Sequence, residues 1–336
     1  MRIRRMGRSG LQVSEVCLGT MTFGNQCDQT TSFRIMDVAD AAGVDFFDTA
    51  DVYPLGGGPE TRGATDEIVG QWLHERQVRN RIVLATKCRG IMGPRPNDQG
   101  LSRQHIIAAC EDSLRRLRTD HIDLYQVHGP DPDTPIEETL RAMEDLVRSG
   151  KVRYIGCSNF AAWQLALALG TSARSGLARF DCAQPRYNIL FRMVEDELLP
   201  LCRAEGVGVI AYNPLAGGML TGRYGVSQEP EPGTRFTLRG SGEIYRRRYW
   251  NEVVMGEVNR LGQHCIAHGY SLTHLALAWV LEQPGITSAI VGASRAEQLE
   301  ESLSGVDFRL NDEDRAVCNE VWFRLPRERD PAIARR

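Results

Sequence analysis

The chain has 336 residues, of which 42% are hydrophobic and 25% are charged, and its formal net charge is −3. This is the composition of an ordinary globular protein, so it excludes wholesale disorder. No apolar run approaches the roughly 20 residues that a membrane-spanning helix needs. Because the near-neutral charge balance contains no basic blocks, we expect neither nucleic acid nor a membrane as a partner. Nine cysteines without a C-x-x-C pair, several of them inside apolar runs, indicate a reducing, cytoplasmic location.

The basic residues are strongly biased toward arginine. Of the 40 lysines and arginines, only Lys87 and Lys151 are lysines. Surface charge is the plain explanation for any one arginine in such a chain, whereas each of the two lysines calls for a specific structural or functional explanation.

The chain begins with a predicted β-hairpin, because residues 2–6 and 11–14 flank the turn sequence Gly-Arg-Ser-Gly. Short apolar runs rich in β-branched residues then predict eight strands. These runs cover residues 16–20, 44–48, 82–87, 122–128, 152–157, 180–184, 207–212 and 287–292.

Amphipathic segments separate the predicted strands. Residues 102–118 and 252–268 carry apolar stripes at helical spacing. Residues 134–150 begin Thr-Pro-Ile-Glu, which predicts a capping box with proline at the first helical position. Two connections, 54–64 and 213–249, are long enough to predict lids or binding loops.

Eight apolar strands alternating with helices predict an α/β fold with a parallel sheet. Eight units close a (β/α)₈ TIM barrel, here with an N-terminal β-hairpin and long βα loops. We expect one domain over residues 1–336. A doubly wound open sheet is the alternative that the pattern leaves open.

Titratable side chains lie where three successive strands end. Asp48 ends the second strand and Tyr53 follows it, Lys87 ends the third strand, and His128 ends the fourth. In barrel enzymes the catalytic groups come from the C-terminal ends of the strands. Taken singly, the aspartate is explained by a turn cap, the histidine by a satisfied hydrogen bond and the tyrosine by packing. Their convergence on one rim favours a shared site.

These four side chains suit the reduction of a carbonyl group. A lysine cation close to a tyrosine lowers the pKa of the phenol by about 1–3 units, and a carboxylate holds that lysine in place. A neutral imidazole can donate a hydrogen bond to a carbonyl oxygen. The tyrosine is then a general acid that protonates this oxygen as a hydride reaches the carbon.

With these residues in place, the sequence resembles the aldo-keto reductase superfamily over nearly its whole length. The resemblance is carried by FDTADVY (47–53), ATK (85–87), DLYQVHGPD (123–131), GCSNF (156–160), AQPRYN (183–188), AYNPLAGGMLTGRY (211–224) and VGASRAEQLEES (291–302). It implies Tyr53 as the general acid, tuned by Lys87 and Asp48, with His128 orienting a small-molecule carbonyl substrate.

The resemblance also implies an NADP cofactor. Ser158, Asn159 and Gln184 would hold the nicotinamide carboxamide and Tyr212 would stack on the ring. The remaining implied cofactor residues are Gly19, Thr20 and Met21 beside the site, Asn213, Pro214, Leu215, Ala216, Gly217, Arg223 and Arg235 over the pyrophosphate, and Gly292, Ser294, Arg295, Gln298 and Glu301 at the adenosine end.

The adenosine end has local physical support, because an arginine at a helix N-terminus suits a 2′-phosphate. Many relatives carry Arg or Lys at the position of Gln298 and Asn at that of Ser302. These differences bear on the preference for NADP over NAD.

Three further patterns have plain explanations. Gly206-Val-Gly208-Val-Ile-Ala211 matches G-x-G-x-x-A but leads into a strand, whereas a dinucleotide fingerprint follows one. His264 and His268 have a metal-binding spacing without supporting ligands, so we expect no metal. The acidic run 311–315 predicts a solvated helix start.

The alternatives come from other classes of protein. The sequence is also similar to the β subunits of voltage-gated potassium channels, which implies a regulatory nicotinamide-binding subunit. The chain starts almost directly with the hairpin, which counts against a tethered N-terminal peptide. A Schiff-base lyase using Lys87 as nucleophile is a third hypothesis.

For the substrate, the loop after Tyr53 and the arginines of 235–248 are compatible with a sugar or a nucleotide-linked ketosugar.

Overall fold

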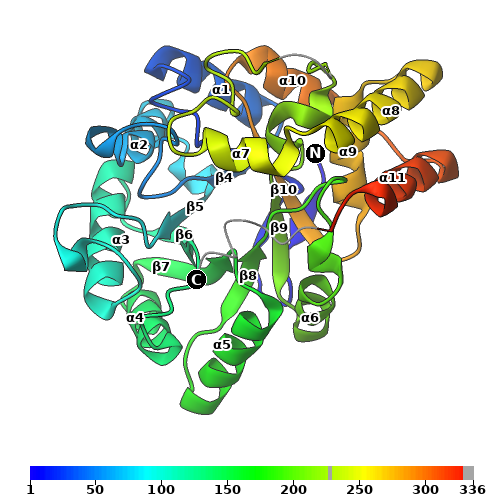
Figure 1. Cartoon of the computed structure of the whole chain (residues 1–336). Helices are drawn as coiled ribbons and strands as arrows, with labels where there is room; N and C mark the ends of the chain where they lie inside the picture. The colour runs from blue at the N-terminus through cyan, green and yellow to red at the C-terminus, as the bar shows by residue number, and fades with distance from the viewer. Residues whose placement is uncertain (226–228, 328–336) are drawn as a thin grey trace.

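The computed structural model describes residues 1–225 and 229–327; residues 226–228, within the long loop 213–249, and residues 328–336 lie outside the described part. Its centre is a closed barrel whose strands follow the order β10-β3-β4-β5-β6-β7-β8-β9, all neighbours being parallel (Figure 1). The predicted (β/α)₈ barrel is therefore confirmed and the open sheet excluded. The eight barrel strands within the described residues are β3 (Val16–Gly19), β4 (Phe46–Asp48), β5 (Val83–Cys88), β6 (Ile122–Val127), β7 (Val152–Ser158), β8 (Phe180–Gln184), β9 (Gly208–Tyr212) and β10 (Ile286–Gly292).

Helices surround the barrel (Figure 1). None of those within the described residues has the length and apolar character needed to cross a membrane. They are α1 (Gln29–Ala41), α2 (Ala64–Arg76), α3 (Arg103–Leu117), α4 (Ile136–Arg148), α5 (Ala162–Ser175), α6 (Leu198–Glu205), α7 (Gly242–Tyr249), α8 (Glu252–His268), α9 (Leu272–Glu282), α10 (Ala296–Ser304) and α11 (Asp312–Arg324).

One predicted helix start is wrong. Helix α4 begins at Ile136 with Pro135 in the capping position, and no side chain caps it. The Thr134 hydroxyl donates instead to Asp131 Oδ2 at 2.9 Å, so it is committed to the preceding loop. The other two predicted helices are confirmed, α8 with the predicted bounds and α3 starting after its cap, Ser102.

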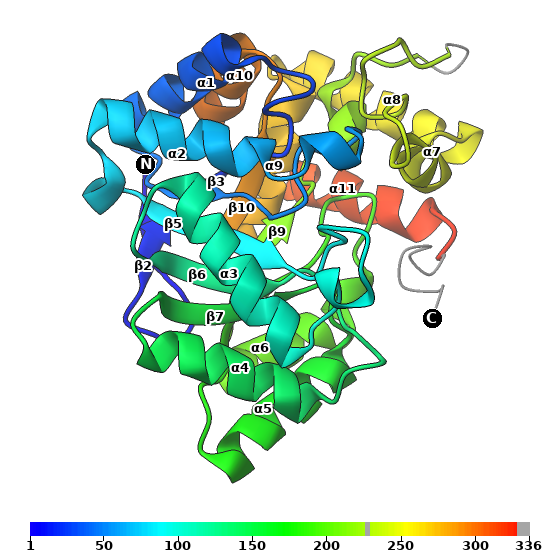
Figure 2. The same ribbon diagram turned by 90° about the vertical axis from the view of Figure 1, so that its left-hand side faces the viewer.

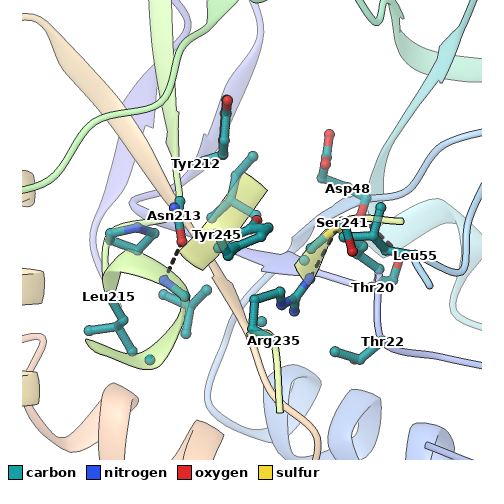
Figure 3. Close-up of a pocket in the computed structure, with 18 of the residues that line it drawn as sticks. Thr20, Thr22, Asp48, Leu55, Tyr212, Asn213, Leu215, Arg235, Ser241 and Tyr245 are labelled. Atoms are coloured by element: carbon teal, nitrogen blue, oxygen red, sulfur yellow. Dashed lines mark hydrogen bonds between the residues drawn. The ribbon is translucent and has the colours of Figure 1, made fainter. Parts of the chain in front are cut away.

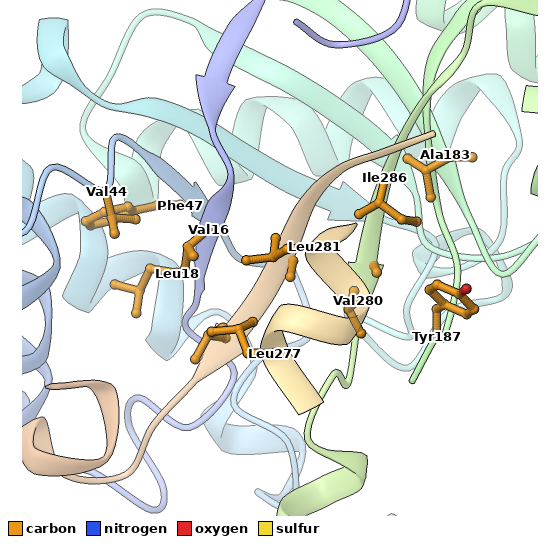
Figure 4. Close-up of a cluster of buried hydrophobic side chains, with 14 of the residues drawn as sticks. Val16, Leu18, Val44, Phe47, Ala183, Tyr187, Leu277, Val280, Leu281 and Ile286 are labelled. Atoms are coloured by element: carbon orange, nitrogen blue, oxygen red, sulfur yellow. The ribbon is translucent and has the colours of Figure 1, made fainter. Parts of the chain in front are cut away.

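Side chains along each strand alternate between the outside and the inside of the barrel, which gives two separate apolar clusters. Val16, Leu18 and Phe47 belong to the large core between the strands and the outer helices, where Leu277 and Leu281 of α9 are also buried (Figure 4). The alternate residues of the strands face the inside of the barrel and form a smaller inner cluster, which includes Cys17, Phe46, Ala85, Leu124, Cys182, Ile210 and Ile290. Because successive side chains of a strand face opposite sides, polar residues further along the same inner rows reach one end of the barrel.

The other end of the barrel is closed by the hairpin of β1 (Ile3–Arg5) and β2 (Gln12–Ser14). Met6 and Val13 are fully buried in the inner cluster. The side view places β2 at the end of the barrel away from α7 (Figure 2). The predicted hairpin is confirmed, and the site is confined to the C-terminal mouth.

Candidate active site

A cavity of about 1090 Å³ opens at the C-terminal mouth of the barrel. Loops after the strands form its walls, together with α7 from the long loop 213–249 (Figure 3). Of the residues expected at the site, Asp48, Tyr53 and His128 line the cavity, and so do all the expected cofactor residues except Ala216. Ala216 is completely buried and lies behind the lining.

Strand alternation explains why the four titratable groups meet. Phe46 and Asp48 of β4 share the inner face of the barrel, as do Ala85 and Lys87 of β5. On β6 the same row begins at Leu124 and, two residues at a time, leads to His128 just beyond the strand end. The structure therefore brings together the groups that the sequence placed at strand ends.

Lys87 is completely buried between the other groups. Its Nζ forms an ion pair with Asp48 Oδ2 and donates a hydrogen bond to Thr49 O at 2.8 Å. The same atom lies 5.1 Å from the centre of the Tyr53 ring. Burial disfavours the charged form, but the negative charge of Asp48 prevails and raises the pKa of Lys87 above its ordinary value. Lys87 is thus a fixed cation beside the phenol.

Asp48 is held on its other oxygen by two amides. Its Oδ1 accepts hydrogen bonds from Gln126 Nε2 at 3.1 Å and Gln184 Nε2 at 2.9 Å. Gln126 pairs with Lys87 in the barrel register and is completely buried. Gln126 is not among the residues expected from the sequence, although a glutamine two residues before His128 in an inward-facing row is a usable signal.

The pKa of Tyr53 departs from the expectation. Burial raises the pKa of Tyr53 and outweighs the lowering effect of Lys87, while the charge of Asp48 adds to the rise. The expected net decrease is therefore wrong for this state of the protein. The phenol is protonated near neutrality, which is the form that a general acid requires.

His128 is uncharged over the physiological range. Burial, together with the cations Lys87 and Arg89, lowers its pKa to about 3. Its ring meets that of Tyr53 edge to face, with ring centres 5.7 Å apart. The site therefore pairs a protonated phenol with a neutral imidazole, and each carries a hydrogen-bond donor.

A chain of hydrogen bonds crosses the mouth from β9 toward β6. The Tyr212 hydroxyl donates to Asn159 Oδ1 at 2.9 Å, and Asn159 Nδ2 donates to His128 O at 2.9 Å. Ser158 Oγ donates to Gln184 O at 2.9 Å. Ser158, Asn159, Gln184 and Tyr212 all line the cavity.

The connection after β9 turns sharply around Asn213. Asn213 Oδ1 accepts a hydrogen bond from Gly217 N at 2.6 Å, and Asn213 Nδ2 donates to the Tyr249 hydroxyl at 3.0 Å. Gly217 has φ 72°, a left-handed conformation that favours glycine. Figure 3 shows Arg235 and Tyr245 between this turn and the Thr20 side of the cavity.

The far end of the cavity reaches the start of α10. Arg295 is the residue before this helix and its side chain is exposed. Gln298 Oε1 accepts hydrogen bonds from Ser294 N at 2.9 Å and Ser294 Oγ at 3.0 Å. The Gln298 side chain is therefore hydrogen-bonded to the segment just before α10, and Arg295 supplies the positive charge at this helix start.

The structure accounts for each of the three further patterns. His264 Nε2 lies 2.8 Å from Asp314 Oδ1 and His268 Nε2 lies 3.3 Å from Glu313 Oε2, so both join α8 to α11. The expectation of a solvated start at 311–315 is wrong for Asp314, which is completely buried by these contacts and by Tyr270. Gly206 and Gly208 pack closely against Gly7 of the hairpin turn.

Comparisons with known proteins agree with this geometry. The sequence profile of the Aldo/keto reductase family matches residues 15–322. The chain is 40% identical to the "Uncharacterized oxidoreductase YrpG" of Bacillus subtilis, over 94% of each chain. It is 38% identical to a "Probable voltage-gated potassium channel subunit beta" of Arabidopsis thaliana, over 91% of this chain and 92% of the relative. It is also 32% identical to the "Versiconal hemiacetal acetate reductase" of Aspergillus parasiticus, over 96% and 97% respectively.

Proposed function

Because the chain belongs to the aldo/keto reductase family and is an oxidoreductase of carbonyl compounds, we propose that it reduces aldehydes and ketones with NADPH and that Tyr53 is the general acid. The observation that carries the proposal is the buried Lys87, paired with Asp48 and 5.1 Å from the centre of the Tyr53 ring. A buried ion pair is costly to desolvate and contributes little to stability, and such perturbed buried charges are concentrated at functional sites.

The cavity residues fit a nicotinamide dinucleotide. Amide and hydroxyl groups of Ser158, Asn159 and Gln184 lie at one end of the cavity, beside Tyr212. Arg223 and Arg235 also line the cavity, and Arg295 lines it at the start of α10, where a 2′-phosphate would find a cation. When bound, the reduced nicotinamide would supply the hydride.

The protein's own groups would handle the proton. His128, being neutral, donates an N–H to the carbonyl oxygen and orients it. Tyr53 transfers its phenolic proton to the same oxygen, which becomes the hydroxyl of the product. Lys87 stabilises the phenolate that remains, and Asp48, held by Gln126 and Gln184, keeps Lys87 in place.

The similarity to potassium-channel β subunits supports a second candidate function, a nicotinamide-binding regulatory subunit. The two candidates differ in turnover, since an enzyme oxidises NADPH continuously when a carbonyl compound is added. The Schiff-base hypothesis is tested by borohydride trapping with a carbonyl substrate. A covalent adduct on Lys87 would favour it.

A panel of aldehydes and ketones, followed by NADPH absorbance with NADH in parallel, tests the proposal directly. We expect substrate-dependent oxidation of NADPH and a higher kcat/KM with NADPH than with NADH. Tight NADPH binding without turnover on any carbonyl compound would support the regulatory subunit instead.

A further inference from the structure

Gln126 is a completely buried glutamine that lies behind the wall of the cavity. It belongs to β6 and pairs in register with Lys87 of β5, and it does not itself line the cavity. Its Nε2 donates a hydrogen bond to Asp48 Oδ1 at 3.1 Å, and its Oε1 accepts one from Gln184 Nε2 at 3.2 Å. Gln126 therefore connects Asp48 of the buried ion pair with a residue proposed to hold the cofactor.

A glycine on the intervening strand makes room for this connection. Strand β7 lies between β6 and β8, and Gly156 of β7 pairs with Gln126 on one side and Cys182 on the other. A Cβ built on Gly156 would lie 3.2 Å from Gln126 Cγ and 3.0 Å from Cys182 O, which is tighter than ordinary van der Waals contact. The missing side chain thus leaves the space through which Gln126 reaches Gln184, two strands away.

The direction of both amide groups is set by Asp48. A carboxylate only accepts hydrogen bonds, whereas a glutamine amide has a donor end and an acceptor end. Because Asp48 is held as a carboxylate by Lys87, Gln126 and Gln184 must each turn an N–H toward Asp48 Oδ1. A reversed Gln184 amide would place its oxygen against the carboxylate and against the Gln126 oxygen, and both contacts would be repulsive.

The oxygen of the Gln184 amide is consequently left for a ligand. Gln184 is only 4% exposed, yet it lines the cavity. Its Nε2 donates both N–H groups, to Asp48 and to Gln126, and its Oε1 accepts no hydrogen bond from the residues that the structure describes. A buried acceptor is costly to leave unpaired, so we expect a ligand in the cavity to supply a donor there.

The neighbouring side chains have used their donors in the same way. Asn159 Nδ2 donates to His128 O at 2.9 Å and to Ser158 Oγ at 3.0 Å. The Ser158 hydroxyl donates its one proton to Gln184 O at 2.9 Å. Of the side chains of Ser158, Asn159 and Gln184, only acceptor oxygens therefore remain for a ligand, which favours a ligand group that carries N–H donors.

We propose that Gln126 is a positioning residue for the cofactor, which fixes the Gln184 amide so that Gln184 Oε1 accepts a hydrogen bond from the NH₂ group of the nicotinamide carboxamide. The proposal rests on the NADPH-dependent function proposed above and adds a residue that links the ion pair of Asp48 and Lys87 to the cofactor site. Gln126 touches neither cofactor nor substrate and acts through Gln184.

The test compares two ligands that differ only at the carboxamide. NADP⁺ carries the NH₂ group, whereas 3-acetylpyridine adenine dinucleotide phosphate has a methyl group in its place. Calorimetric titration of the protein with each ligand gives two Kd values without any turnover. For the wild-type protein we expect NADP⁺ to bind about tenfold tighter or more, because the acetyl group leaves Gln184 Oε1 unpaired.

Two variants assign this discrimination to Gln126. Gln126→Met has a side chain of similar length without an acceptor for Gln184 Nε2, so the ratio of the two Kd values should fall to about threefold or less. Gln126→Glu should restore the ratio. A carboxyl group buried beside Asp48 stays protonated, donates its proton to Asp48 and keeps an oxygen for Gln184 Nε2.

Gln283→Leu is the matched control. Gln283 is a half-buried glutamine that follows α9, and its Nε2 donates to Trp279 O at 2.9 Å. This variant should keep the wild-type ratio. General loosening of the barrel would weaken both ligands together and leave the ratio unchanged, so the ratio separates positioning from a merely structural role. Gln126→Leu takes the place of Gln126→Met if the latter does not fold, and the wild-type comparison needs no variant.

The outcomes separate this proposal from the one beneath it. Equal Kd values of the two ligands for the wild-type protein overturn the assigned direction of the Gln184 amide. A ratio that survives in Gln126→Met, or that is lost in Gln126→Glu, overturns the role of Gln126 while the proposed cofactor stands. Failure of the wild-type protein to bind either ligand counts against the NADPH-dependent function itself.

Discussion

Asp48 and Lys87 determine each other's state at the centre of the site. Either charge alone would be costly in a fully buried position, so their pairing keeps a cation beside Tyr53 without solvent. The sequence alone indicates that Lys87 has a specific role, because lysine is rare in this chain and this one lies at the end of a predicted strand. The direction of the Tyr53 pKa could not, because it depends on how deeply the ring is buried.

The shape of the lysine side chain gives the first prediction. Lys87→Arg should lower kcat for carbonyl reduction by about 100-fold or more, because a planar guanidinium cannot replace a compact ammonium between Asp48 and Tyr53. Steady-state kinetics with NADPH would measure the change. Lys151→Arg is the matched control: this half-exposed lysine pairs with Glu111 on the surface, and activity should be retained. A Lys87→Arg enzyme with normal rates would remove the need for a compact cation.

The protonation states of Tyr53 and His128 predict the pH dependence of reduction. The reacting form has a protonated phenol and a neutral imidazole. Because the pKa of His128 is lowered to about 3 and that of Tyr53 is raised by burial, both forms persist across neutral pH. We expect kcat/KM to be flat near neutrality and to fall only as alkaline pH ionises Tyr53. A loss of activity below pH 7 that disappears in His128→Asn would contradict the neutral imidazole.

At the scale of elements, strands were easier to predict than helix starts. The strands coincide with short apolar runs, and several have a polar residue such as Asp48, Lys87 or His128 at or next to their end; both features are local. The predicted start of α4 is wrong because the Thr134 hydroxyl donates its hydrogen bond to Asp131 in the preceding loop and does not cap the helix. The spacing of Gln126 from His128 indicates an inward-facing side chain, but its contact with Asp48 follows only when β6 is placed beside β5 in register.

The turn after β9 is an element whose geometry can be tested. In Gly217→Ala, the new Cβ would lie 2.7 Å from Tyr245 Cδ1, at a φ of 72° that disfavours alanine. We expect a loss of stability of about 1–2 kcal/mol and a several-fold higher Kd for NADPH, because Tyr245 and the turn both line the cavity. Fluorescence titration and thermal unfolding measure the two effects.

Gly262→Ala is the control for that substitution. Gly262 lies inside α8 with no atom within 4 Å of a built Cβ. Alanine should leave NADPH binding unchanged and stabilise the helix by up to about 1 kcal/mol. Equal NADPH affinities in the two variants would show that the turn does not shape the cofactor site.

At the scale of the whole molecule, the barrel has a structural end and a functional end. The hairpin closes one end with Met6 and Val13, and the loops build the cavity at the other. Glu15 links the hairpin to the barrel: it is buried, and it pairs with Arg2 at 2.8 Å and Arg4 at 2.6 Å. Arg4 also donates hydrogen bonds to Leu281 O and Ile286 O, which joins the hairpin to the connection between α9 and β10.

Replacing this carboxylate should destabilise the fold without altering the chemistry. Glu15→Gln should lower the free energy of unfolding by about 1.5–3 kcal/mol, the usual value of hydrogen bonds to a charged group. Urea unfolding measures the loss, and kcat should be unchanged. Glu137→Gln, which breaks the exposed pair with Arg141, should cost no more than about 0.5 kcal/mol.

The contribution of Glu15 should also depend on pH. Burial raises the pKa of Glu15, but the hydrogen bonds from Arg2 and Arg4 outweigh it and hold the pKa below its ordinary value of 4.5. A depressed folded-state pKa stabilises the protein above that ordinary value, and the stabilisation is lost as pH falls through the folded-state pKa. The difference between wild type and Glu15→Gln should therefore shrink in acid. A difference that stays constant down to pH 3 would contradict the assignment.

The central claim is that Tyr53 is the proton donor at a preformed cofactor site. The most direct measurement is the Tyr53→Phe variant, assayed for carbonyl reduction and titrated with NADPH in parallel. We predict that kcat falls by about 10²–10⁴-fold while the Kd for NADPH stays within about twofold of the wild-type value, because the phenol hydroxyl is removed and the cavity is not. A Tyr53→Phe enzyme that binds NADPH and still reduces carbonyl compounds at the wild-type rate would contradict the account.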